Sequence, residues 1–558
     1  MNNFLSVWLK TLLVVLVVCV NAESFAAAPP DAGQMLRDSR RDAVLPAPPS
    51  APSTINAPEQ AHPAPPSGAD DVRVKVTRFT FNGNLALSED ILRAAVVEYE
   101  NKPLNFGELV SAVEKVEALY KKEGYFLAQA YLAPQKIKDG SIEINISEGF
   151  LGQSRLEGES RTNPNVIYAY LDQLPKGRAV KLVELERQIM LINDLAGSSA
   201  SLDLQASEEP GRTDLVLAQK MDPLLSGRIE LDNYGMPSTG KNRVAVFLNA
   251  NSPFHLGDRL SGNLMRSDNG NLVSYGLNYA LPVGSSGLQL TAGTSLSEYS
   301  LGGAFANLNG SGTVHSYRVG TSYPVVRSRA VSLNLKLDVA HNDLLDRILA
   351  TKVEKSSDVI TATAASDWTD EWAGGGANRA ELAVTGGYLN GGATSGTKGG
   401  YDKAIVTLQR DQNIRPHLTM STQLTHQQAG KNLDSSEKFS VGGPTTMPGY
   451  ASGEASGDNG TLVRLKLTYR IGDNLSAGAF VDYAHIQAVF DPAPSSSCHT
   501  RATVTGNNCH FSDVGVSLDW LGSSGLAASL IMAWAGSEVP NPKDNDRPRI
   551  WINIGYLW

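Results

Sequence analysis

The chain has 558 residues, of which 42% are hydrophobic and 19% charged, so it is too long for one ordinary domain and is neither wholly disordered nor collagen-like. Its formal net charge of −9 argues against a general nucleic-acid binder, because no basic excess is present to neutralise phosphates. The mean hydropathy of −0.18 suits a soluble protein. It also suits a large transmembrane β-barrel, whose polar lumen-facing residues offset its apolar lipid-facing ones.

The first 70 residues predict three segments. The apolar run Leu12–Val20 follows Lys10 and is too short to span a membrane, so residues 1–27 are expected to be a secretory signal peptide, removed with Cys19. Residues 28–44 are expected to form a short helix that starts near Asp31 and is stable only if it docks. Residues 45–70 are rich in Pro, Ala and Ser and predict an extended linker.

Two α+β domains are expected next, over residues 71–149 and 150–220, each with the order β-α-α-β-β. In the first, a capping-type start at Ser88 opens one helix, and a longer amphipathic helix is stopped by Gly124. Its closing strands are expected at residues 126–132 and 141–147. In the second, helices at 163–174 and 182–195 lie between strands at 152–156, 200–206 and 213–220.

From residue 221 to 558 the helical period is replaced by strict alternation of apolar and polar residues, as in the segment from Val331 to Val339. The 338 residues of this region accommodate about 16 transmembrane strands with their loops. The last strand, Arg549–Trp558, ends on Tyr556 and Trp558 and resembles the C-terminal signal of bacterial outer-membrane barrels. We therefore expect an antiparallel outer-membrane β-barrel, with a soluble β-sandwich as the alternative.

Cys498 and Cys509 flank a polar stretch and are expected to form a disulfide that staples an exposed loop. His499 and His510 beside them leave a metal site as the alternative, but structural zinc sites use closer cysteine pairs. No metal is therefore expected.

No catalytic residues and no cofactor are predicted, so the chain is not expected to be an enzyme. The segment Gly391–Lys398 approaches a phosphate-binding loop, but Thr397 separates its lysine from the second glycine and a strand follows instead of a helix. No zinc-binding histidine pair and no nucleophile elbow occur.

The glycine-rich segment Val441–Gly460 carries acidic residues and an aromatic residue, which predicts a loop that folds back and needs close backbone approach. Phe480 and Asp482 share one face of a following strand, and an Asp on the inner wall of a barrel needs a partner. The candidate loop residues are Met447, Pro448, Gly449, Tyr450, Gly453, Glu454, Gly457, Asp458 and Gly460.

These segments together resemble the two-partner secretion transporters, the TpsB family of the Omp85 superfamily, which exports haemolysins and filamentous adhesins. The resemblance rests on the motifs Asp31–Gln34, Tyr131–Gln135, Asp232–Gly235 and Gly453–Gly460. It implies that residues 28–44 are a plug helix, that the two α+β domains are periplasmic POTRA domains, and that the glycine-rich segment is the family's inward loop.

One departure from the family pattern affects the inward loop. The family's loop tip reads Val-Arg-Gly-Tyr, and its Arg pairs with the Asp of an F-x-D-x-G strand motif. Here Pro448 stands in place of the Arg and Ala484 in place of the Gly, while Asp482 is kept. Our hypothesis is that another lumen-facing Arg or Lys serves as the partner of Asp482.

The resemblance implies an outer-membrane transporter that recognises an unfolded TpsA-like exoprotein in the periplasm and moves it to the cell surface or medium. The expected partners are that exoprotein, through an amphipathic secretion domain, outer-membrane lipids and the barrel assembly machinery, and no nucleic acid. The alternative is an Omp85-type assembly factor that inserts other barrels. A passive porin is disfavoured because it would lack the tandem α+β domains.

Overall fold

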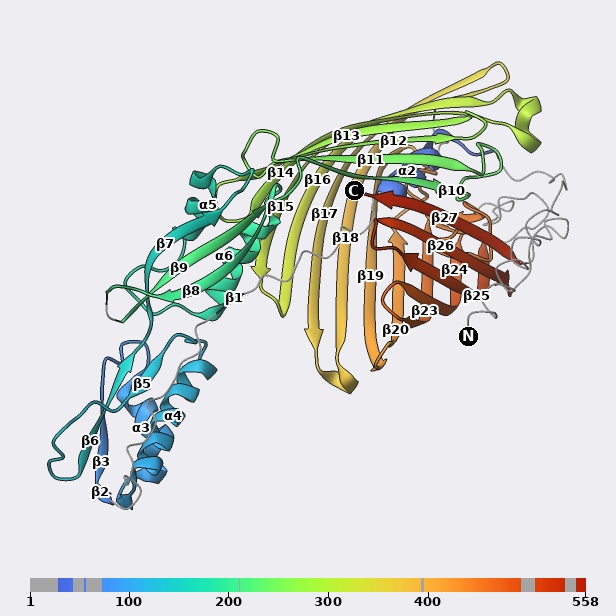
Figure 1. Ribbon diagram of the computed structural model, residues 1–558. Coiled ribbons are helices and arrows are strands. Elements are labelled where there is room, and N and C mark those ends of the chain that lie inside the picture. Colours follow the sequence, from blue (N-terminus) through green and yellow to red (C-terminus); the bar gives the residue numbers. More distant parts are fainter. Residues whose placement is uncertain are drawn as a thin grey trace, which may run out of the picture.

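The computed structural model describes residues 29–43, 55–56, 73–209, 211–392, 396–492, 507–536 and 548–558. Two small α+β domains extend from one end of a large barrel (Figure 1). The expected signal peptide and most of the expected linker lie outside the described residues. In the part of the chain that is described, no helix is both long and apolar enough to cross a membrane.

The first α+β domain packs two helices against a three-stranded sheet of order β3-β6-β5. Helix α4 starts with a capping box, in which the side chains of Asn105 and Glu108 each accept the other residue's backbone N–H. A further pair, β2-β4, was not expected, and the strand expected at residues 126–132 is reduced to three residues. The elements are β2 (Val74–Val76), β3 (Arg78–Asn82), α3 (Glu89–Val96), η3 (Val97–Tyr99), β4 (Lys102–Leu104), α4 (Phe106–Lys122), β5 (Gln129–Tyr131) and β6 (Ser141–Ser147).

The second α+β domain has the order β-α-α-β-β and the sheet order β1-β8-β9-β7. Its core is formed by apolar residues of α6 and the sheet, with Leu185, Ile189 and Leu202 fully buried. The edge strand β1 comes from the linker and runs parallel to β8. The elements are β1 (Ile55–Asn56), β7 (Phe150–Gly158), α5 (Pro164–Leu171), α6 (Leu182–Asp194), β8 (Ser198–Ala206) and β9 (Arg212–Met221).

The rest of the chain forms a closed antiparallel barrel of 16 strands, in which β27 pairs with β10 to close the ring. This confirms the barrel and excludes the sandwich. The strands are β10 (Leu225–Asp232), β11 (Arg243–Asn251), β12 (Arg259–Ser267), β13 (Leu272–Val283), β14 (Leu288–Ser300), β15 (Ser311–Arg327), β16 (Val331–Ile348), β17 (Thr351–Asp370), β18 (Gly376–Gly391), β19 (Gly399–Arg415), β20 (Leu418–Ala429), β23 (Asn459–Ile471), β24 (Leu475–Gln487), β25 (Asn508–Leu521), β26 (Leu526–Ala535) and β27 (Arg549–Leu557).

The alternation seen in the sequence corresponds to the two faces of the wall. On β16, Leu335, Leu337 and Val339 are exposed on the outer face, whereas Asn342 is fully buried on the inner face. Ile554 and Tyr556 of β27, and Trp558 just after it, are likewise on the outer face. An apolar outer surface with a polar lumen explains how the barrel keeps a mildly negative mean hydropathy.

The second α+β domain contacts the barrel at the turn between β15 and β16. Arg187 of α6 donates to the Pro324 carbonyl at 2.9 Å, and Asp194 pairs with Arg327 at 2.6 Å. This turn marks the end of the barrel that faces the α+β domains. Because neighbouring strands are antiparallel, β16, β18 and β20 all start at this end and run toward the opposite one. The long loop that follows β20 therefore starts at the opposite end of the barrel.

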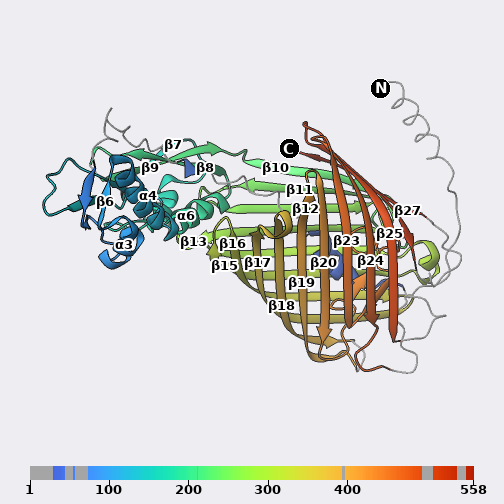
Figure 2. The ribbon, with the colours of Figure 1, turned by 90° about the horizontal axis from the view of Figure 1, so that it is seen from below.

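Two elements occupy the lumen. Helix α2 (Ala32–Ala43) lies inside the ring of strands, where it is drawn in blue (Figures 1 and 2). The second element is the loop at residues 430–458, hereafter the inner loop, which contains the short strands β21 (Phe439–Val441) and β22 (Ala455–Gly457). Met447 and Asp458 of this loop are completely buried. A helix and a loop of the same chain thus occupy part of the lumen.

Candidate functional site

The tip of the inner loop is bonded to the barrel wall at three successive residues. The Pro448 carbonyl accepts a hydrogen bond from Trp551 Nε1 at 2.7 Å, and the Gly449 N–H donates to Asp513 Oδ2 at 2.6 Å. The Tyr450 hydroxyl donates to the Ser512 carbonyl at 3.0 Å. The tip therefore lies against β25 and β27.

Close backbone approach, which the sequence predicted for this segment, is seen at Gly449. A Cβ atom at this position would lie 2.7 Å from the Asp513 Cβ and 2.9 Å from the Ala535 backbone nitrogen. Neither atom belongs to a flexible side-chain end, so any larger residue would push the tip off the wall. The neighbouring Tyr450 packs edge-on against Phe511, with ring centroids 5.4 Å apart.

Asp482 lies on the inner wall, on the same buried face of β24 as Phe480. Its partner is Arg464, which stands directly opposite on β23, with Nε 3.1 Å from Oδ1 and Nη2 3.3 Å from Oδ2. Arg464 Nη1 also donates to the Thr445 carbonyl of the inner loop at 2.6 Å. Arg464 thus joins wall and loop, and it is the lumen-facing cation that the sequence led us to expect as the partner of Asp482.

Sequence reasoning did not name Arg464, although strand parity offered a signal. Leu462 and Arg464 are both of even number and share one face of β23, and Leu462 is buried. Asp513 was also missed. It is the register partner of Asp482 on β25, and both carboxylates are buried. Only the register of β24 with β25, which the sequence does not show, places these two carboxylates side by side.

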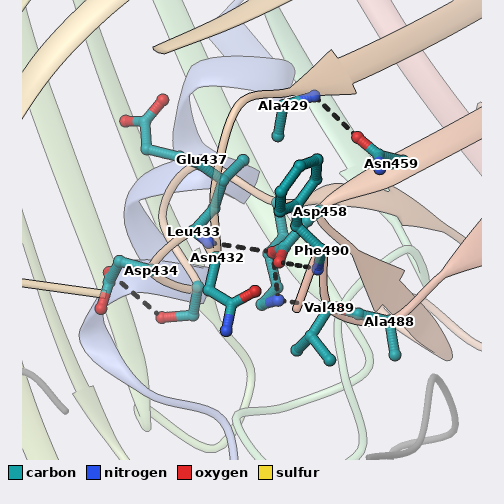
Figure 3. A network of polar contacts seen from close by, with 12 residues as sticks. Ala429, Asn432, Leu433, Asp434, Glu437, Asp458, Asn459, Ala488, Val489 and Phe490 are labelled. Carbon is teal, nitrogen blue, oxygen red and sulfur yellow. Dashed lines mark hydrogen bonds and ion pairs between the residues drawn. The ribbon is translucent and has the colours of Figure 1, made fainter. Parts of the chain in front are cut away.

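Asp458, at the C-terminal end of the inner loop, bonds this end to the start of the loop and to the segment after β24 (Figure 3). Its carboxylate forms an ion pair with Lys438 and accepts the Leu433 N–H at 3.1 Å and the Phe490 N–H at 2.8 Å. Phe490 follows β24, so this one buried side chain joins two segments that are distant in sequence. Hydrogen bonding of this kind compensates the cost of burying a carboxylate.

Three of the remaining candidate residues belong to the inner loop, and the fourth belongs to the barrel wall. Glu454 is buried, and Gly453 has a positive φ of +70° and lies against Gln34 of α2. Gly457 is part of β22 and pairs with Phe439. Gly460 is a correction: it belongs to barrel strand β23, not to the loop, and its missing side chain leaves room for the Phe439 ring.

Helix α2 is bonded to both the wall and the inner loop. Asp31 caps it by accepting the Gln34 N–H at 2.9 Å, and its other oxygen accepts from the Ser435 hydroxyl at 2.6 Å. On the wall side, Asp346 of β16 accepts the Ala32 N–H at 2.8 Å. An apolar contact adds to this, because Met35 and Leu36 pack with Tyr299, Leu301, Val314 and Leu344 of the wall.

Glu437 is the charged junction of helix, loop and wall. Only 3% of its side chain is exposed, and it pairs with Arg40 of α2 at 3.1 Å and with Lys403 of β19 at 2.8 Å. Beside it, Lys355 of β17 pairs with Asp434 of the inner loop at 2.9 Å. Glu437 and Asp434 are thus each paired with a lysine of the wall, and these pairings do not depend on the helix.

The C-terminal aromatic residues lie on the outer face of the barrel, whereas Cys509 belongs to the buried hydrophobic cluster that contains Met447 and Tyr450 of the inner loop. The rings of Tyr556 and Trp558 stack at 6.2 Å on the outer face, and the Trp558 backbone exchanges hydrogen bonds with Gly227 of β10. Cys509 is buried at the start of β25 and is disulfide-bonded. Cys498 lies outside the described residues, so the expected pairing of these two cysteines stays a prediction.

Comparison with protein families gives two matches. Residues 74–149 match a POTRA domain of the ShlB type, and residues 211–491 match the haemolysin secretion/activation protein family ShlB/FhaC/HecB. The second match covers half of the chain. The chain belongs to the ShlB/FhaC/HecB family. The two-partner secretion family expected from the sequence motifs is thereby confirmed.

Relatives of this chain are transporters by name. The heme/hemopexin transporter protein HuxB of Haemophilus influenzae strain 86-028NP is 23% identical over 84% of each chain. The outer membrane transporter CdiB of Escherichia coli O6:K15:H31 is 22% identical over 76% of this chain and 73% of its own. The family and its barrel place this chain in the bacterial outer membrane, with its N-terminal domains in the periplasm.

Solved structures share the fold. CdiB from Escherichia coli superposes with a TM-score of 0.71 at 18% identity, covering 94% of this chain and 96% of the other. BamA from Haemophilus ducreyi, lacking POTRA domains 1–3, superposes with a TM-score of 0.52 at 13% identity, covering 87% of this chain and all of the other. This chain therefore shares its fold with CdiB and BamA. The second α+β domain is called the second POTRA domain below, as the sequence led us to expect.

Proposed function

We propose that this protein secretes one unfolded TpsA-like exoprotein across the outer membrane, through the lumen of its own barrel. The single observation that carries the proposal is that the lumen is closed by two elements held through polar contacts. Arg40 joins helix α2 to the inner loop, and Lys355, Lys403 and Arg464 join the inner loop to the wall. Charged groups freed from these contacts can be hydrated when water enters the lumen, and the ring of hydrogen-bonded strands does not depend on them, so the elements can be displaced without unfolding the barrel.

Each part of the chain has a role in this proposal. The POTRA domains bind the exoprotein, and helix α2 plugs the barrel until the exoprotein arrives. The inner loop shifts its position on the wall while the exoprotein passes. The C-terminal strand with Tyr556 and Trp558 is the segment that the barrel assembly machinery would recognise during insertion. The aliphatic and aromatic outer face is the surface that contacts outer-membrane lipids.

The sequence contains no nucleotide-binding motif, and we propose that folding of the exoprotein outside the cell drives its export. Folding on the far side removes the translocated segment from the lumen and prevents its return, because the compact chain no longer fits the pore. The direction of transport would then follow from where the substrate folds.

Deleting the gene and comparing culture supernatants tests the proposal. Loss of one large protein from the medium, restored by the wild-type gene, is the expected result. The alternative, a barrel assembly factor, would leave that protein in the medium and lower the amounts of several unrelated outer-membrane barrels instead. Quantifying both fractions in the same strains separates the two outcomes.

A further inference from the structure

Two buried carboxylates lie side by side on the inner wall, next to the tip of the inner loop. Asp482 of β24 and Asp513 of β25 are directly opposite each other in the ladder, and the two residues are 1% and 0% exposed. Their side chains lie within hydrogen-bonding reach of each other. Two ionised carboxylates this close together and shielded from water would repel each other strongly.

Within the described residues, one cation is bound to this pair of carboxylates. Both oxygens of Asp482 accept hydrogen bonds from Arg464, at 3.1 and 3.3 Å, whereas Asp513 has no ion pair in the described part of the chain. Asp513 Oδ2 accepts the Gly449 N–H at 2.6 Å. Its Oδ1 is buried and receives a hydrogen bond from no donor among the described residues. Buried polar atoms of folded proteins normally have a partner, so this oxygen needs an explanation.

The elements that pack around the pair assign no second cation to Asp513. β26, the strand next to β25, has no ionisable side chain. Lys466 of β23 pairs with Asp519 of β25 at 3.5 Å, and the Arg549 guanidinium of β27 lies over the ring of Trp551. The titratable side chains on the inner face of these strands and at the loop tip are Arg464, Lys466, Asp519, Arg549, Tyr450 and Glu454.

One proton on the pair would account for both features. Placed on Asp513, it would remove one of the two negative charges and turn Oδ1 into a donor toward the Asp482 carboxylate. Oδ2 could still accept the Gly449 N–H, and Arg464 would neutralise the remaining charge on Asp482. Two carboxylates that share a site hold a proton between them for the same electrostatic reason.

Loss of this proton would act on the inner loop at two points. The Gly449 N–H is bonded to Asp513, and the Thr445 carbonyl accepts a hydrogen bond from Arg464 at 2.6 Å. Repulsion between two ionised carboxylates would push Asp513 away from Asp482 and from the loop tip. The second negative charge would also draw Arg464 away from Thr445. Both contacts attach the loop to the wall, so ionisation of the pair would loosen it.

We propose that Asp482 and Asp513 share one proton while the inner loop is seated, and that protonated Asp513 is a positioning residue for the loop tip. Alkaline solution removes the proton and unseats the tip. The proposal goes beyond the secretion function, because it concerns the closed barrel alone and needs no exoprotein for its test.

The variant Asp513→Asn of the full-length transporter tests the role of the proton. An asparagine reproduces the protonated acid at any pH, since its oxygen accepts the Gly449 N–H and its NH₂ group donates to Asp482. In planar lipid bilayers, the mean conductance of the wild type should rise about tenfold between about pH 6 and about pH 10, whereas that of Asp513→Asn should stay low. Asp519→Asn is the matched control, because it removes a half-exposed carboxylate of the same strand and should keep the pH dependence of the wild type.

Infrared spectroscopy tests for the proton itself. At about pH 6, the spectrum of the wild type minus that of Asp513→Asn should contain the carbonyl stretch of a protonated carboxylic acid, and the band should disappear in alkaline solution. If Asp513→Asn does not fold, Asp482→Asn serves in its place. It removes the second carboxylate, so its conductance should likewise not respond to pH.

Three results would each overturn the proposal: a wild-type conductance that does not change with pH, a wild-type pH response in the asparagine variants, or a difference spectrum without the band. Neither experiment measures secretion, so a failure here is distinguishable from a failure of the proposed function.

Discussion

Arg464 of β23 pairs with Asp482 of β24 across one rung of the barrel wall, and the same guanidinium donates to the Thr445 carbonyl of the inner loop. One cation thus satisfies a buried carboxylate and holds a loop against the wall. The loop residue that would perform this in the family pattern is Pro448, which has no charge. The wall of this barrel supplies the cation instead.

Replacing Arg464 by Met should loosen the inner loop. Asp482 would keep its charge in a fully buried position without its cation, at a cost of about 3 kcal/mol or more. We expect a larger and more variable conductance in planar lipid bilayers, together with reduced secretion. Lys466→Met is the control, because Lys466 is half exposed and pairs with Asp519, not with the loop.

Removing Asp482 as well as Arg464 should recover part of the loss. The double variant Arg464→Met/Asp482→Leu no longer buries the Asp482 charge without its cation, so its barrel should resist heat better than that of Arg464→Met. The loop contact at Thr445 stays broken, so conductance should stay high. Wild-type conductance and secretion in Asp482→Ala would contradict a role of this pair in seating the loop.

Gly449→Ala should unseat the loop tip by sterics alone. The added Cβ would lie 2.7 Å from the Asp513 Cβ, closer than side-chain atoms approach in folded proteins. We expect the hydrogen bond from the Gly449 N–H to Asp513 to be lost and conductance to rise as in Arg464→Met. Gly386→Ala is the matched control, since the nearest atom to its added Cβ is 3.9 Å away. A closed channel in Gly449→Ala would show that the tip does not need this contact.

Arg40→Ala should release helix α2 more often. The substitution removes one of the two cations on Glu437, while Lys403 keeps that carboxylate paired. A hydrogen bond to a charged group contributes about 1.5–3 kcal/mol, so the probability of the open channel should rise about tenfold or more. Single-channel recording at two salt concentrations checks this, and the difference from wild type should shrink at high salt because Arg40 is partly exposed.

The first POTRA domain should lose stability in alkali through Tyr120. Burial, and then the hydrogen bond that the Tyr120 hydroxyl donates to the Glu148 carboxylate, raise the pKa of Tyr120 far above its ordinary value. A raised pKa in the folded state means that the folded domain binds more protons, so stability is complete below about pH 10 and falls as the pH rises above it. Pulse proteolysis in urea should show this fall in the wild type.

Tyr120→Phe provides the control for that pH dependence. At neutral pH the variant should be less stable by about 1 kcal/mol, because one hydrogen bond is lost while Glu148 keeps two backbone donors, Leu85 and Ala86. Above about pH 10 the difference between the two proteins should shrink and then reverse. An identical alkaline loss of stability in both proteins would assign the effect to other groups.

The sequence by itself determined everything that depends on local period and composition. Alternation of apolar and polar residues distinguishes the barrel region from the helical one, because a strand has period two and a helix 3.6. Length then sets the number of strands near the 16 that close the ring. The capping residue Asp31 and the helix stop at Gly124 are local signals for the same reason.

Only the tertiary structure decided which side chains meet in the lumen. Strand register places Arg464 opposite Asp482 and Asp482 opposite Asp513. Arg40 meets Glu437 because the inner loop, 397 residues further along the chain, folds back into the lumen. The pairing of β1 with β8 is of the same kind, since two residues in a Pro-rich linker carry no strand signal of their own. Register and long-range contact arise from packing in three dimensions, and local sequence does not encode them.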